Sequence, residues 1–235
     1  MPGPCFLVLK DKNRIERINT MAEEKKTADI TELKAAAERD EDYVIGLKKP
    51  YVFEGKEYTE IDLSGIKKMT IKDAIDAQKS LFNGSEIAAI VLTEASASFA
   101  RAIAAKATGL PIEFFELARL DISRAVKSTV MGHMTLGSGT EKHVMKLEEP
   151  YAYKGRGYTE IDMSRVGELT SLDESRAENR MAEEGVAAAN AQQNFIYACV
   201  IASMATGLPE EFFTGMPLRE VMKLKAAVND SSFFE

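Results

Sequence analysis

The chain has 235 residues, a formal net charge of −7 and a pI of about 5.2, with 45% hydrophobic and 29% charged residues. This is an ordinary globular composition, which excludes a disordered or fibrous chain. The acidic balance argues against binding nucleic acid through its phosphates, and no apolar run reaches the roughly 18 residues of a membrane span. We therefore expect neither nucleic acid nor a membrane as a partner.

Residues 1–42 are predicted to form an N-terminal arm. The apolar start, Met1 to Leu9, has no basic stretch before it and no small-residue cleavage site, so it is not interpreted as a signal peptide. Residues 21–42 are charged and rich in alanine, and Met21 offers a second start. This composition predicts either a short amphipathic helix or an acidic disordered arm.

Two sequence segments recur along the chain. PYVFEGKEYTEIDLS at 50–64 is matched by PYAYKGRGYTEIDMS at 150–164, an offset of 100 residues. ATGLP followed by EFF, at 107–115, recurs at 205–213 with an offset of 98. Matching order and spacing predict a tandem duplication. The first repeat spans residues 43–133 and the second 142–235, and the Gly-Ser-Gly segment within residues 134–141 is interpreted as a flexible linker rather than a phosphate-binding loop.

Each repeat is predicted to open with an antiparallel β-hairpin. In the first repeat, strands at 44–48 and 51–53 lead into a turn at Glu54-Gly55-Lys56 and a return strand at 58–63. Side chains alternate along a strand, so Thr59, Ile61 and Leu63 are predicted to face the helices, while Tyr58, Glu60 and Asp62 face away.

Three to four helices are predicted to follow each hairpin. Their predicted ranges are 71–82, 94–108 and 120–131 in the first repeat, with counterparts at 171–184, around Tyr197, Ile201 and Ala205, and at 218–228. Thr70-x-x-Asp73 and Thr170-x-x-Asp173 have capping-box spacing, and Gly109 and Gly207 stand where helices end. Pro111 and Pro209 suit the first turn of a short helix that carries the Phe-Phe pair. The predicted fold class is α+β, without a parallel sheet.

The chain offers few residues for catalysis. Cys5 and Cys199 lack metal-ligand spacing and are expected to be free thiols, with Cys199 on an apolar helix face as a core residue. His133 and His143 flank the linker and are expected to be solvated or to have incidental roles. We predict no catalytic residue, no metal site and no cofactor.

The carboxylates of the hairpin offer an alternative, enzymatic interpretation. Glu60 with Asp62, and Glu160 with Asp162, share a strand face about 7 Å apart by their spacing. Such a pair could serve a glycosidase or a Mg²⁺ site, and loss of an activity in Glu60→Gln or Asp62→Asn would support it. The competing interpretation, a polar face that sets strand register, is preferred because no further acid or base completes a site.

The recurring residues resemble a known family. An aromatic-x-Gly-[Lys/Arg]-x-Tyr-Thr-Glu-Ile-Asp hairpin followed by Ala-Thr-Gly-Leu-Pro-x-Glu-Phe-Phe is similar to the tail assembly chaperones of Mu-like contractile-tailed phages and prophages. The resemblance covers residues 43–235 as two copies, whereas members of the family generally carry one unit.

The resemblance implies a non-enzymatic function. Proteins of this family are expected to bind the long helical tape measure protein in the host cytoplasm and keep it soluble. They then leave, so they are not expected in the mature virion. Self-association is a further expected interaction. The alternative is a permanent structural component of a phage tail or tail-like particle, which would be found in mature particles.

A chaperone needs apolar surface that it can offer to a helix and later withdraw. Adjacent residues of a helix cannot both point inward, so one phenylalanine of each Phe-Phe pair is predicted to anchor the core and the other to reach a groove edge. Methionine suits an adaptable surface. The predicted partner-binding residues are Phe114, Phe115, Phe212, Phe213, Met204, Met216 and Met222, with plain core packing as the competing interpretation.

Overall fold

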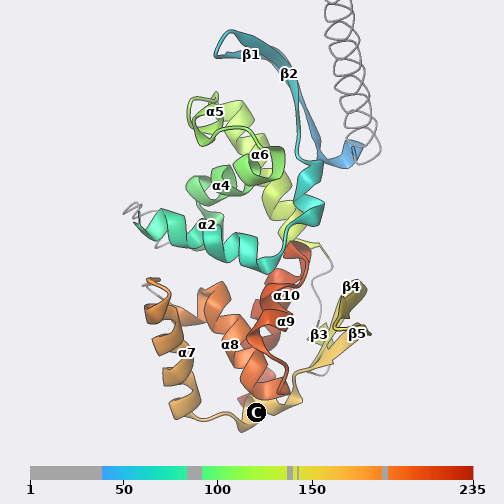
Figure 1. Ribbon diagram of the computed structural model, residues 1–235, viewed down its shortest axis with the longest axis vertical. Helices are drawn as coiled ribbons and strands as arrows, with labels where there is room; N and C mark the ends of the chain where they lie inside the picture. Colours follow the sequence, from blue (N-terminus) through green and yellow to red (C-terminus); the bar gives the residue numbers. More distant parts are fainter. Residues whose placement is uncertain (1–38, 84–91, 137–139, 142, 187–189, 235) are drawn as a thin grey trace, which may run out of the picture. The chain divides into compact units, whose positions relative to one another are not determined.

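The computed structural model describes residues 39–83, 92–136, 140–141, 143–186 and 190–234. The chain divides into two units, residues 1–41 and residues 42–235, and the second contains both repeats (Figure 1). Most of the predicted arm, including Cys5, lies outside the described residues, as do residues 137–139 of the predicted linker.

Both repeats have the predicted α+β architecture, a hairpin followed by helices. The first repeat consists of η1 (Glu41–Tyr43), β1 (Val44–Phe53), β2 (Lys56–Asp62), η2 (Ser64–Lys68), α2 (Ile71–Asn83), η3 (Thr93–Ala95), α4 (Ala97–Thr108), α5 (Ile112–Glu116) and α6 (Leu120–Thr135), where η marks a 3₁₀ helix. The second consists of β3 (Thr140–Glu141), β4 (Val144–Tyr153), β5 (Arg156–Asp162), η4 (Ser164–Glu168), α7 (Ser171–Glu183), η5 (Ala191–Gln193), α8 (Phe195–Thr206), α9 (Glu210–Thr214), η6 (Leu218–Glu220), α10 (Val221–Val228) and η7 (Ser231–Phe234).

The two hairpins share one irregular register. Gly46 pairs with Glu60 and Tyr51 pairs with Tyr58, so residues 47–50 of β1 stand opposite Thr59 alone. The second hairpin has the same bulge between Lys146 and Tyr151. Proline lacks a backbone N–H for strand pairing, so its recurrence within the bulge, at residues 50 and 150, has a direct structural reason.

The hairpin turns confirm the turn prediction. Glu54 and Gly55 have φ of 49° and 78°, and Lys154 and Gly155 have φ of 47° and 80°. Two successive positive φ values produce the twist that a two-residue hairpin loop requires, and glycine takes the second at no steric cost.

The predicted capping boxes and C-cap glycines are also confirmed. The backbone N–H groups of Thr70 and Thr170 donate to the carboxylates of Asp73 and Asp173, at 2.7 and 2.9 Å. Gly109 and Gly207 end α4 and α8 in the left-handed conformation. Pro111 and Pro209 were predicted within the first turn of the next helix but precede it, at the N-cap.

The prediction of strand faces was right for the base of the hairpin and wrong beyond it. Ile61 and Leu63 are buried, but Thr59 is exposed and Tyr58 packs against Phe114. The bulge at 47–50 separates the two halves of the hairpin, so the distal half presents its other face to the helices.

The two repeats pack directly on each other. Ile71 N–H donates to the carbonyl of Met216 at 2.9 Å, and Leu218 N–H donates to the carbonyl of Met69 at 2.8 Å, which forms a short antiparallel bridge around Thr70 and Pro217. Helix α2 also packs against α8, and α6 against η6 and α10. Figure 1 shows α2 lying above α8 and α10.

This contact encloses the central helices of the second repeat. In α8 every residue from Phe195 to Ala202 is buried, and in α10 only Met222 and Ala226 are not. Their counterparts α4 and α6 bury one face each, because nothing described covers their outer side. The same unit therefore occurs in two environments within one chain.

Candidate partner-binding surfaces

The predicted Phe-Phe residues lie in the core. Phe114, Phe115, Phe212 and Phe213 are all at most 3% exposed, so the prediction that one ring of each pair reaches a surface is wrong. The reason is the position of the short helices that carry them. Helix α5 packs against α4 and also lies beneath the hairpin, and α9 packs against α8 in the same way, so both sides of each helix are covered.

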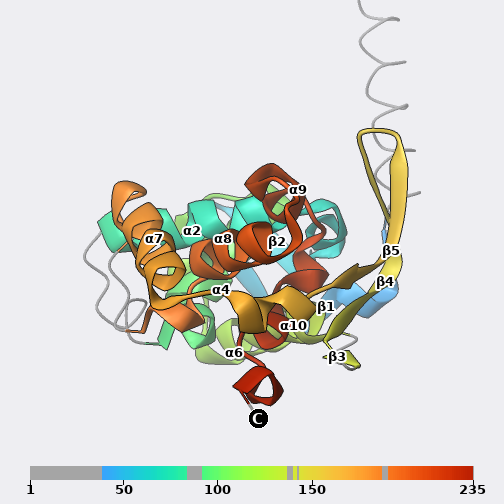
Figure 2. The same ribbon diagram turned by 90° about the horizontal axis from the view of Figure 1, so that it is seen from below.

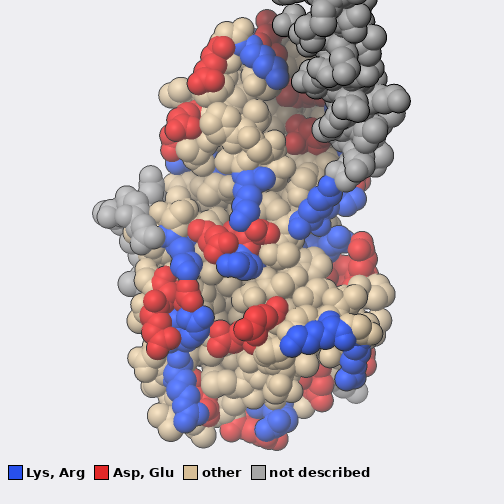
Figure 3. Space-filling model, in the orientation of Figure 1, with Lys and Arg blue, Asp and Glu red and all other residues tan. Residues whose placement is uncertain are grey.

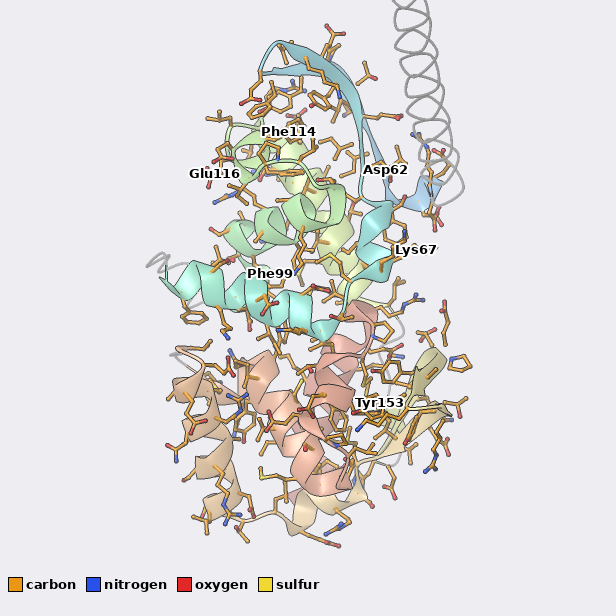
Figure 4. The ribbon with its side chains drawn as sticks, viewed as in Figure 1. Asp62, Lys67, Phe99, Phe114, Glu116 and Tyr153 are labelled. Atoms are coloured by element: carbon orange, nitrogen blue, oxygen red, sulfur yellow. The ribbon has the colours of Figure 1, made fainter. Side chains whose placement is uncertain are left out.

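The hairpin aromatics enclose the first phenylalanine of each pair. The rings of Tyr51, Phe53 and Tyr58 lie 5.0, 5.4 and 4.8 Å from the ring of Phe114, mostly edge to face. Figure 4 shows Phe114 beneath the β1–β2 hairpin. Tyr51 Oη also donates to the carbonyl of Phe114 at 2.9 Å. The two recurring sequence segments thus form one packing unit.

The second repeat reproduces this cluster with nearly equal spacings. The rings of Tyr151, Tyr153 and Tyr158 lie 5.1, 5.2 and 4.8 Å from that of Phe212. Figure 2 shows the β4–β5 hairpin running beside α9. Exposure differs, since Tyr51 and Phe53 are buried but Tyr151 and Tyr153 are only partly so.

The three predicted methionines lie in two environments. Met216 is fully buried and its carbonyl accepts the bridge bond from α2. Met204 and Met222 are partly buried and pack against the core. The structure therefore leaves Met204 and Met222, of the seven predicted residues, with side chains that reach solvent.

A groove lies between the second hairpin and the end of α8. It has a volume of about 560 Å³, and its walls come from strand residues 156–162, Val144, Thr206 and Leu208. Tyr158, Ile161 and Leu208 provide apolar surface, while Arg156 and Glu160 flank it with charge. A volume of this size is within the range of ligand sites in proteins.

The groove is lined by residues that recur in the chain. YTEID of the hairpin contributes to it, as do Thr206 and Leu208 of the helix end. Packing explains the recurrence of Tyr58 and Ile61. It does not explain Thr59, which is exposed together with its counterpart Thr159.

In each repeat a basic side chain lies over the ring of the tyrosine in the YTEID segment, Tyr58 or Tyr158. Lys56 Nζ lies 4.8 Å from the ring centre of Tyr58, and the guanidinium of Arg156 lies 4.9 Å from that of Tyr158. A cation over an aromatic face at this distance is mildly stabilising. Arg156 and Glu160 are both among the residues that line the groove.

The repeats meet across a second, charged cleft of about 230 Å³. Lys79 of α2 pairs with Glu184, and Arg180 of α7 lies 3.3 Å from Glu210 of α9. On the face drawn in Figure 3, basic and acidic side chains are interspersed at this level. Partly exposed ion pairs individually contribute little to stability. We infer that these pairs help to fix how the two repeats align, and we do not interpret the cleft as a ligand site.

His133 was expected to be solvated, and this prediction is wrong. The ring is 3% exposed, and its Nδ1 lies 2.8 Å from the hydroxyl of Tyr43. Burial, with the nearby positive charges of Arg219 and Lys67, lowers the pKa of His133 to about 4. The imidazole is therefore neutral at pH 7. Helix α6 extends to Thr135, past the predicted end, and brings His133 against the hairpin base.

His143 occupies a different position, in the turn between β3 and β4. It has a φ of 65°, its Nε2 lies 2.8 Å from Ser232 Oγ, and its ring lies 4.1 Å from that of Phe233. Through these contacts η7 packs against the start of the hairpin of the second repeat. Sequence reasoning did not identify this role, because no local pattern connects residues 143 and 233.

The paired carboxylates have local structural roles. Asp62 and Asp162 accept hydrogen bonds from the N–H groups of Ser64 and Ser164, at 2.8 and 2.9 Å, where the strand turns into a 3₁₀ helix. The Ser164 bond holds the pKa of Asp162 below its usual value. Among the described residues no three His, Cys, Asp or Glu side chains gather closely enough to hold a metal ion.

Cys199 lies in the core, as predicted, and is a free thiol. Burial raises its pKa, with a smaller contribution from Glu210. None of the helices in the described part of the chain is long and apolar enough to cross a membrane. Comparisons with protein-family models, curated proteins and solved structures find no match to this chain.

Proposed function

We propose that this protein is a non-catalytic tail assembly chaperone of a contractile-tailed phage or prophage. Its client is the tape measure protein, which it keeps soluble in the host cytoplasm until the tail tube forms, and it does not remain in the mature virion. The proposal rests on the resemblance of its two repeats to that family and on the groove at the second hairpin.

The observation that carries the proposal is the recurrence of exposed residues. Thr59 is repeated as Thr159, although neither residue is buried. A residue that packs in the core recurs because the fold requires it, whereas a repeated exposed residue beside a groove favours a shared contact. We infer that each repeat presents this strand to a helical client, with one helix lying in the groove.

The groove has the chemistry that such a client needs. An amphipathic helix would place an apolar side chain against Tyr158 and Leu208, and its polar flank against Arg156 and Glu160. This arrangement leaves the buried Phe-Phe pairs as the support for the hairpin. They shape the surface and do not contact the client.

Co-expression with the large helical protein encoded next to this gene tests the proposal. We expect the client to become soluble and to co-elute with the chain. Thr159→Arg places a long charged side chain in the groove and should weaken the interaction about tenfold or more, and adding Thr59→Arg should weaken it further. Ala152→Arg is the matched control, because Ala152 is exposed on the same hairpin but does not line the groove.

The assignment fails if the client stays insoluble while the chain elutes alone. The second candidate, a permanent tail component, would then be tested by searching for the protein in assembled particles. If the Thr159→Arg variant binds the client as strongly as the Ala152→Arg control does, the client site lies outside the groove.

A further inference from the structure

The first repeat carries an acceptor surface that the second repeat fills. We define the acceptor surface by Met69 to Ile71, Glu94 and Phe99. Met69 and Ile71 form the bridge to Met216 and Leu218, Glu94 binds Lys225, and the Phe99 ring lies 6.0 Å from that of Phe195. Both partners in each of these contacts are buried.

The second repeat contributes a donor face to this contact. Leu218, Met222 and Lys225 are spaced four and three residues apart, so they share one side of η6 and α10. Leu218 is fully buried, and Lys225 is 4% exposed although it is charged. Lys225 is buried where it pairs with Glu94 of the first repeat, whereas Met222 is only partly buried.

The second repeat has its own version of the acceptor surface, and it is open. At the repeat offsets of 100 and 98 residues, Met69 to Ile71 correspond to Leu169 to Ser171, Glu94 to Gln192 and Phe99 to Tyr197. All of these counterparts line one cleft of about 360 Å³, together with Val166, Glu174, Ile201, Val228 and Asn229. The surface that holds a repeat in one half of the chain forms a cleft in the other, and no described residue of the first repeat lines that cleft.

The first repeat likewise has an uncovered donor face. The counterparts of Leu218, Met222 and Lys225 are Leu120, Arg124 and Lys127, on the outer side of α6. Leu120 is 63% exposed, and Leu117, three residues before it, is 72% exposed. In the described part of the chain no bridge joins Arg119 to Thr170, the counterparts of Pro217 and Thr70.

We propose that the outer face of α6 in one copy docks into the α7–α8–α10 cleft of a second copy. The contact repeats, between molecules, the contact that joins the two repeats within a molecule. Its two surfaces are different and lie on different repeats, so the association is head-to-tail and leaves one free donor face and one free cleft at its ends. Chains of more than two copies follow from the same contact.

The two surfaces are complementary in charge and in polarity. The donor face carries Arg124 and Lys127, whereas the cleft presents Glu174 and follows the acidic first turn of α7. Leu120 would enter between Val166, Leu169 and Ile201, as Leu218 enters the first repeat. Gln192 replaces Glu94, so Lys127 would meet an amide rather than a carboxylate, and the contact is expected to be weaker than the internal one.

Sedimentation velocity of the full chain over a wide range of concentrations tests the proposal. We expect the mean mass to rise with concentration and the association to weaken at high salt. Leu120→Asp removes the donor leucine, and Ser171→Arg obstructs the cleft at an exposed position. Each variant alone should associate about tenfold or more weakly than the natural chain.

Mixing the two variants gives the decisive result. The Leu120→Asp copy keeps its cleft and the Ser171→Arg copy keeps its donor face, so a one-to-one heterodimer should form and grow no further. Leu136→Asp, at an exposed leucine outside both surfaces, is the control and should associate normally. Circular dichroism checks that each variant is folded.

A natural chain that stays monomeric at every concentration overturns the proposal. So does a mixture of folded variants that forms no heterodimer while each variant still self-associates. A segment of the same chain could instead occupy the cleft within each molecule. The protein would then be monomeric at every concentration, and this result also contradicts docking of a second copy.

Discussion

Lys225 of the second repeat places its ammonium nitrogen 2.6 Å from the carboxylate of Glu94 in the first, and both side chains are buried. The ring of Phe195 lies 5.5 Å from the same nitrogen. Opposite charges that are paired away from water bind the two repeats at one defined register.

Removing one partner of this pair should be costly. Lys225→Met removes the ammonium group that pairs with the buried Glu94 carboxylate, and we expect the free energy of unfolding to fall by about 3 kcal/mol or more in urea titrations. The double variant Glu94→Gln, Lys225→Met should recover most of the loss, because neither group is then charged. Equal destabilisation by the single and double variants would show that the ion pair does not hold the interface.

Acid should destabilise the fold through His133. Its pKa is about 4 in the folded protein and about 6.5 in an unfolded chain, so the unfolded state binds more protons between these values. The His133 contribution is complete above pH 6.5 and is lost as the pH falls towards 4, by about 3 kcal/mol in total. Thermal unfolding across this range should show a smaller pH dependence in His133→Gln, and an unchanged slope would contradict the assignment.

Gly65 should not tolerate a side chain. A Cβ at this position would lie 2.1 Å from the backbone carbonyl oxygen of Ala107, which cannot rotate away. We expect Gly65→Ala to destabilise the protein by about 1–3 kcal/mol, because η2 must shift from α4. Gly46→Ala is the matched control, since a Cβ there meets nothing within 4 Å and stability should change little. Similar unfolding midpoints for the two variants would exclude the close contact.

The thiol of Cys199 should be unreactive while the protein is folded. It is 1% exposed and burial raises its pKa, so little thiolate is available and no reagent reaches it. In a Cys5→Ser variant, which has one remaining thiol, modification should be slow in buffer and rapid in denaturant. Rapid modification under native conditions would mean that α8 opens readily, contrary to its enclosure by both repeats.

The sequence predicted the units well because their signals are local. Hairpin turns, capping residues and C-cap glycines depend on neighbours within a few residues, and Gly55, Asp73 and Gly109 adopt the expected conformations. Because of the duplication, each predicted element could be compared with its counterpart in the other repeat. The end of α6 was placed too early, because the helix continues through Gly132 and His133 to Thr135.

The surfaces were predicted less well, because exposure depends on packing between repeats. Adjacent phenylalanines were expected to point in different directions, yet a five-residue helix covered on both sides buries both. One signal was available in the sequence, the i, i+4, i+7 spacing of Leu120, Arg124 and Lys127 against Leu218, Met222 and Lys225. The two stripes share their leucine and their lysine, and they differ at the middle position, which is Arg124 in the first repeat and Met222 in the second.

The central claim, that this chain binds a helical tail protein through its hairpin groove, is tested most directly by calorimetric titration. The purified full chain would be titrated with soluble helical fragments of the large protein encoded beside its gene. We predict saturable binding by at least one fragment, weakened about tenfold or more by Thr159→Arg and unchanged by Ala152→Arg. No detectable heat or complex with any fragment, from a chain that is folded by circular dichroism, would contradict the claim.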